Sequence, residues 1–345
     1  MTNIIFFVRH FTERGTEIAV YDYAKYNEEI LGNKSFIVHM PMKMGDLDQV
    51  YQKFNARFTV LEIDDIRDIT RIIRNYKIDF FYTLTHGDQD IYEFDNKQIW
   101  LNCKTVKHCV FSTAYKEADF YFSISNYLNQ KNDTAIPVIP HIVEPPVDTK
   151  TTLREQLGIP ADAIVIGRYG GFNEFNIKQA HDAICDFLLS QTLESNVYFL
   201  FMNTRQFAHH PRIIYLEKNI DFGYKERFIN TCDAMIHARI EGETFGLSIA
   251  EFSVRNKPVI TSPVGDLEHI GILGDKAILY YSKDNLIAVF KNIKYIIRGT
   301  TNWNAYSYYS PANIMEMFDA FVFNKKYPLL EKWSKTSTFS QSYEK

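Results

Sequence analysis

The residues of this 345-residue chain that are best suited to chemistry lie in one stretch, His237–Phe252. It holds two glutamates, Glu243 and Glu251, with Gly246 between them. An apolar, strand-like run precedes the stretch, and a helical pattern continues from it. A glycine loop that leads into a helix presents free backbone N–H groups and the positive end of the helix dipole. This arrangement suits a bound phosphate.

The second glutamate lies within the predicted helix, on a face that is otherwise apolar. Glu251 shares this face with Leu247, four residues earlier, and Val254, three residues later. A buried carboxylate needs a partner, and Arg239 or Arg255 could form an ion pair with it. The functional alternative is a pair of ligand hydroxyls, such as those of a ribose. Both possibilities stay open at this point.

The two glutamates also resemble a known pattern. Glu243 and Glu251 match the E-x7-E motif of retaining GT-B glycosyltransferases, and Gly242, Phe245 and Gly246 resemble family 4 of these enzymes. The segments on either side strengthen the resemblance, because one is similar to the family's Ala-Asp element with its strand and the other to its Gly-x-Pro-Val-Ile strand. These segments are Cys232–His237 and Asn256–Ile260.

The resemblance implies a fold and an activity. The fold would be α/β, with two Rossmann-like domains facing each other across a cleft. The activity would be transfer of a hexose-type sugar from a UDP- or GDP-sugar to a glycan or other hydroxyl acceptor, with retained configuration and without a metal or other cofactor. Glu251 would hold the donor ribose and Glu243 the sugar hydroxyls, while Phe245, Gly246 and Leu247 would lie beside the donor.

Two cationic residues resemble those that hold the donor diphosphate in this family. Arg168 follows the predicted strand Ala163–Gly167, where relatives place an arginine. Lys178 is the candidate for the second cation, although it lacks the neighbouring glycine that relatives have. An arginine and a lysine together can stabilise a diphosphate leaving group without Mg²⁺. The alternative for Lys178 is a solvated lysine at a helix start.

Four further residues resemble family positions near the transferred sugar. Gly15 lies where relatives have a loop with two glycines, although a plain turn before a helix explains it nearly as well. His108, at a strand end, matches a histidine that faces the sugar, and a structural role is its alternative. His237 and Arg239 resemble positions beside the donor.

A rival signal is the D-x-D triplet of Asp88 and Asp90, which holds a metal ion in the other major glycosyltransferase fold. Such a triplet is common by chance and lies far in sequence from the phosphate elements, so we expect no metal site. The net charge of −4 gives no general attraction to nucleic acid. The expected partners are therefore a nucleotide-sugar and a hydroxyl acceptor.

The elements that must position these residues alternate between short apolar runs and helical patterns, which predicts parallel sheets with crossover helices. In the first half we expect strands at Ile4–Val8, Phe36–His39, Phe58–Ile63, Phe80–Thr83, Val106–His108, Phe120–Ser125 and Ala135–Ile142, and helices at Glu17–Leu31, Asp65–Asn75 and from Asn126. In the second half we expect strands at Ala163–Gly167, Val197–Met202, Arg212–Tyr215, Ala234–Ala238, Pro258–Ser262 and Ala277–Tyr281, and helices at Thr152–Leu157, Asn176–Leu189, Lys225–Cys232, Gly246–Asn256 and Lys283–Arg298.

The proline-rich segment Val143–Asp148 predicts a linker between domains 1–148 and 149–309. Residues 310–345 predict a helix that packs back on the first domain, and a frayed tail beyond Trp333. No apolar run is long enough to span a bilayer, and the four cysteines lack metal or disulfide spacing. We expect a cytoplasmic protein with reduced thiols; a peripheral membrane contact is compatible with the sequence but not indicated by it.

Other functions on this scaffold remain open. A nucleotide-sugar epimerase needs no acceptor, and a non-catalytic protein could bind a nucleotide-sugar or glycan in the same pocket. A phosphorylase would be expected to carry a pyridoxal-phosphate lysine motif, which we do not find. A nicotinamide-dependent oxidoreductase is disfavoured because no G-x-G-x-x-G follows any predicted strand.

Overall fold

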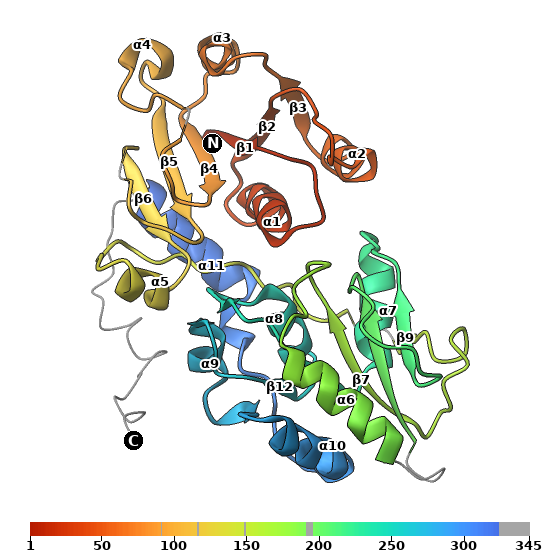
Figure 1. Cartoon of the computed structure of the whole chain (residues 1–345). Coiled ribbons are helices and arrows are strands. Elements are labelled where there is room, and N and C mark those ends of the chain that lie inside the picture. Colours follow the sequence, from red (N-terminus) through yellow and green to blue (C-terminus); the bar gives the residue numbers. More distant parts are fainter. Residues whose placement is uncertain (91, 116, 148–149, 191–195, 324–345) are drawn as a thin grey trace. The chain divides into compact units, whose positions relative to one another are not determined.

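The computed structural model describes residues 1–90, 92–115, 117–147, 150–190 and 196–323 (Figure 1). The chain divides into two compact units. Among the described residues, the first comprises Met1–Ile142 and Tyr309–Phe323, and the second is Val143–Tyr308. The end of the predicted linker, at Asp148, and the predicted tail beyond Trp333 lie outside the described residues.

The first unit contains a six-stranded sheet in the order β3-β2-β1-β4-β5-β6, with every pair parallel. The strands are β1 (Asn3–Val8), β2 (Lys34–His39), β3 (Thr59–Glu62), β4 (Phe80–Thr85), β5 (Lys104–Cys109) and β6 (Phe120–Ser123). The helices are α1 (Gly15–Glu29), α2 (Asp48–Asn55), α3 (Ile69–Tyr76), α4 (Lys97–Trp100), α5 (Asn126–Lys131) and α11 (Pro311–Phe318).

The C-terminal helix α11 belongs to this first unit (Figure 1). Ser310 caps it, because its side chain accepts a hydrogen bond from the backbone N–H of Asn313, and Pro311 occupies the first turn, where its missing N–H costs nothing. Phe318 packs on Tyr23 and Tyr82, with ring centroids 5.4 and 5.7 Å apart. The expected return of this helix to the N-terminal domain is confirmed.

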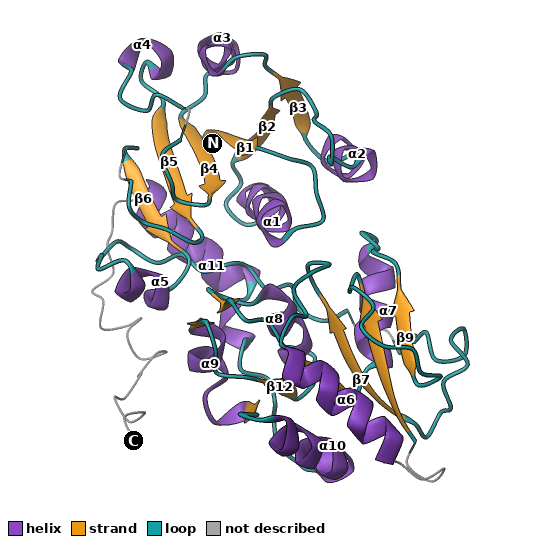
Figure 2. Cartoon of the chain, in the orientation of Figure 1, coloured by secondary structure: helices purple, strands orange, loops and turns teal. Residues whose placement is uncertain are grey.

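The second unit repeats the same strand order, written β14-β12-β10-β7-β8-β9, and is again parallel. Figure 2 shows the strands of both units in orange and their helices in purple. The sheet is made of β7 (Ile164–Tyr169), β8 (Val197–Met202), β9 (Ile213–Leu216), β10 (Ala234–Ile236), β12 (Val259–Thr261) and β14 (Ala277–Leu279). Its helices are α6 (Lys178–Ser190), α7 (Phe222–Thr231), α8 (Leu247–Ser253), α9 (Glu268–Leu273) and α10 (Lys283–Arg298). A short pair, β11 (Gly242–Glu243) and β13 (Asp266–Leu267), lies outside the sheet.

The burial of their side chains explains why apolar segments such as β1 and β8 form strands inside the sheets. In β1, every residue from Ile4 to Val8 is buried, and in β8 only Tyr198 is partly exposed. Strands that are covered on both faces are typical of parallel sheets with helices on each side. The α/β class expected from the sequence is confirmed in both units.

One predicted strand and one predicted helix are wrong. Proline or glycine residues in or beside these segments explain the difference. Ala135–Ile142 forms only an isolated bridge between Ser123 and Val138, because Pro137 and Pro140 cannot donate to a ladder. Thr152–Leu157 forms turns rather than a helix and ends at Gly158, which has φ +64°.

Two further expectations concern the burial of the cysteines and the presence of membrane-spanning helices. Cys103, Cys109 and Cys232 are buried as expected, whereas Cys185 is half-buried. Among the described residues, no helix has both the length and the apolar content needed to cross a membrane.

Candidate functional site

Glu243 lies on β11, which is held by close backbone contact with β13. Gly242 and Gly265 both adopt left-handed conformations, with φ +65° and +69°. A Cβ at Gly242 would overlap the backbone of Asp266, and a Cβ at Gly265 would overlap that of Glu241. Only glycine fits at these two positions, so the segment bearing Glu243 is fixed against the loop after β12.

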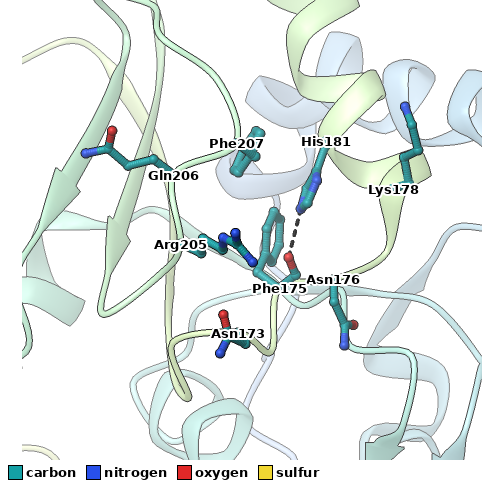
Figure 3. Close-up of a pocket in the computed structure, with 8 residues that line it drawn as sticks. All are labelled: Asn173, Phe175, Asn176, Lys178, His181, Arg205, Gln206 and Phe207. Atoms are coloured by element: carbon teal, nitrogen blue, oxygen red, sulfur yellow. Dashed lines mark hydrogen bonds between the residues drawn. The ribbon is translucent and has the colours of Figure 1, made fainter.

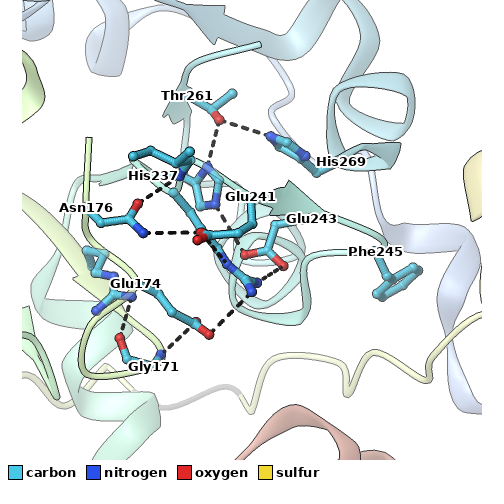
Figure 4. A network of polar contacts seen from close by, with 12 residues as sticks. Gly171, Glu174, Asn176, His237, Glu241, Glu243, Phe245, Thr261 and His269 are labelled. Carbon is cyan, nitrogen blue, oxygen red and sulfur yellow. Dashed lines mark hydrogen bonds and ion pairs between the residues drawn. The ribbon is translucent and has the colours of Figure 1, made fainter. Parts of the chain in front are cut away.

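The Glu243 carboxylate is shared by two basic side chains (Figure 4). His237 Nε2 is 3.3 Å from Oε1, and Arg239 Nη1 donates to Oε2 at 3.2 Å. Burial alone would raise the pKa of Glu243, but the hydrogen bond from His237 and the charges of His237 and Arg239 outweigh it and lower the pKa to about 2. Glu243 is therefore ionised at neutral pH, and its side chain retains 18 % exposure.

The Thr261 hydroxyl lies between the rings of His237 and His269. His237 Nδ1 is 2.9 Å from Thr261 Oγ1, and that oxygen is 3.1 Å from His269 Nε2. Burial lowers the pKa of His269 to about 3, so its ring is neutral. Since the ionised Glu243 can only accept, His237 donates to it through Nε2–H, and the Thr261 hydroxyl links the two histidine rings.

We expect Thr261→Val to break this link and Thr261→Ser to preserve it. Valine removes the hydroxyl that contacts His237 Nδ1 and His269 Nε2, whereas serine keeps it. The ¹⁵N chemical shifts of these two nitrogens should therefore move in the valine variant and stay close to the wild-type values in the serine variant. Unchanged shifts of both nitrogens in Thr261→Val would contradict this arrangement.

Arg239 extends the network toward β7. Besides Glu243, it lies 3.4 Å from Glu174 and 3.5 Å from Glu241. Glu174 accepts a hydrogen bond from the Gly171 backbone N–H at 3.2 Å, and the Gly171 carbonyl accepts one from Arg168 at 3.0 Å (Figure 4). The structure therefore joins the predicted residues His237, Arg239, Glu243 and Arg168 in one continuous set of contacts.

Arg168 itself is enclosed. It is only 4 % exposed, and its Nη1 donates to Thr204 Oγ1 at 2.6 Å and to the Asn203 carbonyl at 3.3 Å. Burial lowers the pKa of Arg168 to about 10, which still leaves it charged. The Arg168 guanidinium thus donates hydrogen bonds to other groups of the protein, and these bonds hold the loop after β7.

Lys178 lies apart from this network. It starts α6, its side chain is 82 % exposed, and its ammonium contacts both carboxylate oxygens of Asp182 at 2.7 Å. This placement is that of a solvated lysine at a helix start, the alternative left open by the sequence, and an exposed pair of this kind contributes little to stability.

The partner of Glu251 is one that sequence reasoning missed. Glu251 is 9 % exposed on α8, and its Oε1 pairs with Nζ of Lys225 on α7. The prediction that Arg239 or Arg255 pairs with Glu251 is wrong. Arg239 pairs with Glu243. Arg255 pairs with Glu226, and it donates a hydrogen bond at 2.7 Å to the backbone carbonyl of Glu251. Lys225 is 26 positions from Glu251, so no local spacing signals the pair.

The three other predicted donor residues surround the start of α8. Gly246 precedes the helix with φ +85°, close to Glu243 and His269. Phe245 is 2 % exposed and packs edge-on against Tyr306, whose hydroxyl donates to the Phe245 carbonyl at 2.9 Å. Leu247, the first residue of the helix, is half-buried. Phe245 therefore anchors the loop from the core side.

In the first unit, His108 is fully buried within the sheet. Its Nδ1 lies 2.7 Å from the Tyr82 hydroxyl, and burial together with the neighbouring His141 lowers its pKa to about 3. It has no exposed surface for a substrate, so this geometry supports the structural alternative. Gly15 is the first residue of α1, preceded by Arg14 without a side-chain cap.

The D-x-D aspartates contact basic side chains of the protein instead of forming a cluster of metal ligands. Asp90 lies 2.9 Å from the fully buried Nζ of Lys107 and 3.3 Å from Arg9, and Asp88 lies 2.8 Å from His86. No group of three or more His, Cys, Asp or Glu suited to a metal ion occurs in the part of the chain that the structure describes.

Comparison with solved structures identifies the architecture. A glycosyltransferase from Rickettsia africae ESF-5 aligns over 98 % of this chain and 99 % of its own length, with TM-score 0.64 and 18 % identity. Anabaena Alr3699/HepE in complex with UDP and glucose gives TM-score 0.68 at 14 % identity over 93 % and 99 %. The lipopolysaccharide outer core galactosyltransferase WaaB gives 0.61 at 11 % over 94 % and 100 %.

The chain has the GT-B fold. The match is one of structure, because the sequence matches no family model and no curated protein. Within the GT-B fold, the contacts centred on Glu243 follow β10 of the second unit.

Proposed function

We propose that this protein is a retaining glycosyltransferase of the family 4 type, which transfers a sugar from a nucleotide-diphosphate sugar to a hydroxyl acceptor. The observation that carries the proposal is the ionised Glu243, held by His237 and Arg239 directly after β10 of a GT-B domain. Of the proteins with this fold, HepE has been solved with UDP-glucose bound, which supports a nucleotide-sugar as the donor.

The chemistry of the site fits this role. A carboxylate that is ionised at neutral pH accepts hydrogen bonds from sugar hydroxyls, and its two basic partners fix its direction before a donor arrives. Glu251, oriented by Lys225, is the proposed acceptor for the ribose hydroxyls. Positive charge from Arg168 and Lys178 would stabilise the departing diphosphate, whose oxygen would take the acceptor's proton.

The test is a screen of UDP-, GDP- and ADP-sugars by thermal shift, followed by product analysis with the donor that binds. A ligand that binds the folded state raises its apparent stability by mass action. We expect one donor to stabilise the protein and to yield a product with the donor's anomeric configuration, seen by ¹H NMR. Inverted product would reject retention, and conversion of the donor without an acceptor would favour an epimerase.

We expect transfer to continue in excess EDTA, since protein cations rather than a metal would stabilise the leaving group. Initial rates with EDTA, and with added Mg²⁺ or Mn²⁺, should agree within about twofold. A strict metal requirement would refute this part of the proposal and direct attention to Asp88 and Asp90.

A further inference from the structure

The second unit contains a cavity of about 480 Å³ that the proposed donor contacts of Glu243 and Glu251 do not use (Figure 3). It lies between the start of α6 and the segment after β8. Its lining residues are Asn173, Phe175, Asn176, Lys178, His181, Arg205, Gln206 and Phe207. A space of this size is adequate for a small polar ligand.

The charge of the lining favours an anion. Among the described residues that form it, two are cationic and none is acidic. Arg205 is exposed, and within the described part of the chain its guanidinium takes part in no ion pair. Its backbone N–H donates to the Phe172 carbonyl at 2.8 Å, which ties it to the loop on the far side. This local charge contrasts with the net charge of −4 of the whole chain.

The Lys178 ammonium is also available to an anion. Its pair with Asp182 is exposed and lies within one helix, where such a pair contributes little to stability. A phosphate dianion carries more charge than one carboxylate and can displace it. Two cations of different geometry, a forked guanidinium and a point-charge ammonium, are suited to phosphate oxygens.

The rest of the lining suits a sugar ring. His181 stacks on Phe207 with ring centroids 4.2 Å apart and planes at 6°, and Phe175 packs beside both. The His181 Nε2–H donates to the Phe175 carbonyl at 2.8 Å, so the ring plane is fixed. Side-chain amides of Asn173 and Gln206 add hydrogen-bonding groups for hydroxyls.

We propose that this cavity binds a phosphate ester of a sugar, with Arg205 and Lys178 on the phosphate and the His181–Phe207 pair beside the ring. The phosphate could belong to the nucleotide-sugar or to a separate sugar phosphate. Asn176 connects the cavity to the Glu243 network, because it donates to Glu241 at 3.2 Å and accepts from the Ile240 backbone at 2.8 Å. The Glu251–Lys225 pair uses α7 and α8, which contribute nothing to the lining.

The experiment measures binding of glucose 6-phosphate, inorganic phosphate and UDP to the full chain by calorimetry at low ionic strength, where charge contacts are least screened. Arg205→Gln should weaken glucose 6-phosphate about tenfold or more, the loss expected for one charged hydrogen bond. Arg205→Lys should weaken it less, and Lys178→Gln is an independent second variant. Lys291→Gln, an exposed lysine on α10, is the charge-matched control and should bind as the wild type does.

The three ligands separate the two sources of phosphate. If Arg205→Gln weakens glucose 6-phosphate but not UDP, the cavity takes a separate sugar phosphate; if it weakens both, the cavity takes the donor diphosphate. Glucose 6-phosphate should bind more tightly than inorganic phosphate because of the aromatic pair. Wild type that binds none of the three, or equal affinities in wild type and Arg205→Gln, would overturn the proposal. None of these results depends on sugar transfer, so the proposed function is tested separately.

Discussion

Glu243→Gln should lower the rate of sugar transfer by roughly a hundredfold to a thousandfold, the usual cost of removing one preorganised electrostatic contact. Glutamine keeps the size of the side chain but replaces the ionised carboxylate, and its amide cannot accept from both His237 and Arg239 through two oxygens. The measurement is kcat/KM with the donor found by screening. Circular dichroism should show an unchanged fold.

Glu155→Gln is the matched control, because Glu155 is an exposed glutamate of the same unit outside the contacts described above. It should retain the wild-type rate. If Glu243→Gln turned over donor as fast as this control, Glu243 would have no part in transfer. If it lost activity together with its folded signal, Glu243→Ala and Glu243→Asp would show whether charge or packing is responsible.

Lys225→Met should cause the largest loss of stability among substitutions at the site. The side chains of Lys225 and Glu251 are 15 % and 12 % exposed, so the substitution leaves a nearly buried carboxylate without its cation. Breaking such a pair costs about 3–5 kcal/mol, which for a unit of this size lowers Tm by roughly 6–20 °C. Differential scanning calorimetry measures the shift.

The double variant Lys225→Met with Glu251→Gln should recover most of the lost stability, since it removes the buried negative charge together with its cation. Lys178→Met is the control for an exposed ion pair. It removes a lysine that lies 2.7 Å from Asp182 but is 82 % exposed, so the Tm of this variant should differ from that of the wild type by about 1 °C or less. Equal shifts in Lys225→Met and Lys178→Met would mean that Glu251 is not held by Lys225.

The fold could be predicted from sequence because its signals are local. Apolar runs such as Ile4–Val8 and Val197–Met202 are dense in β-branched and aromatic residues, and the structure places both within sheets. The prediction was wrong for Ala135–Ile142, where the composition favours a strand but two prolines prevent pairing. It also missed α2 and α9, which are short helices of eight and six residues.

The site could be predicted only in part. His237, Arg239 and Glu243 are close in sequence, and the structure brings them together. Lys225, Thr261 and His269 could not be found, because they reach the site through other strands and helices. His108 shows another limit: five of the six residues in β5 are buried, so alternation along the strand does not reveal which side chain has access to a ligand.

The interlocked glycines at 242 and 265 have a practical consequence for redesign of substrate preference. Neither backbone can shift without the other, so the two loops act as a single module even though more than twenty residues separate them. Replacing one of them with the corresponding loop of another GT-B protein would misplace Glu243 unless its counterpart were exchanged in the same step. Libraries that vary both loops together should therefore give far more folded, active members than libraries that vary either alone.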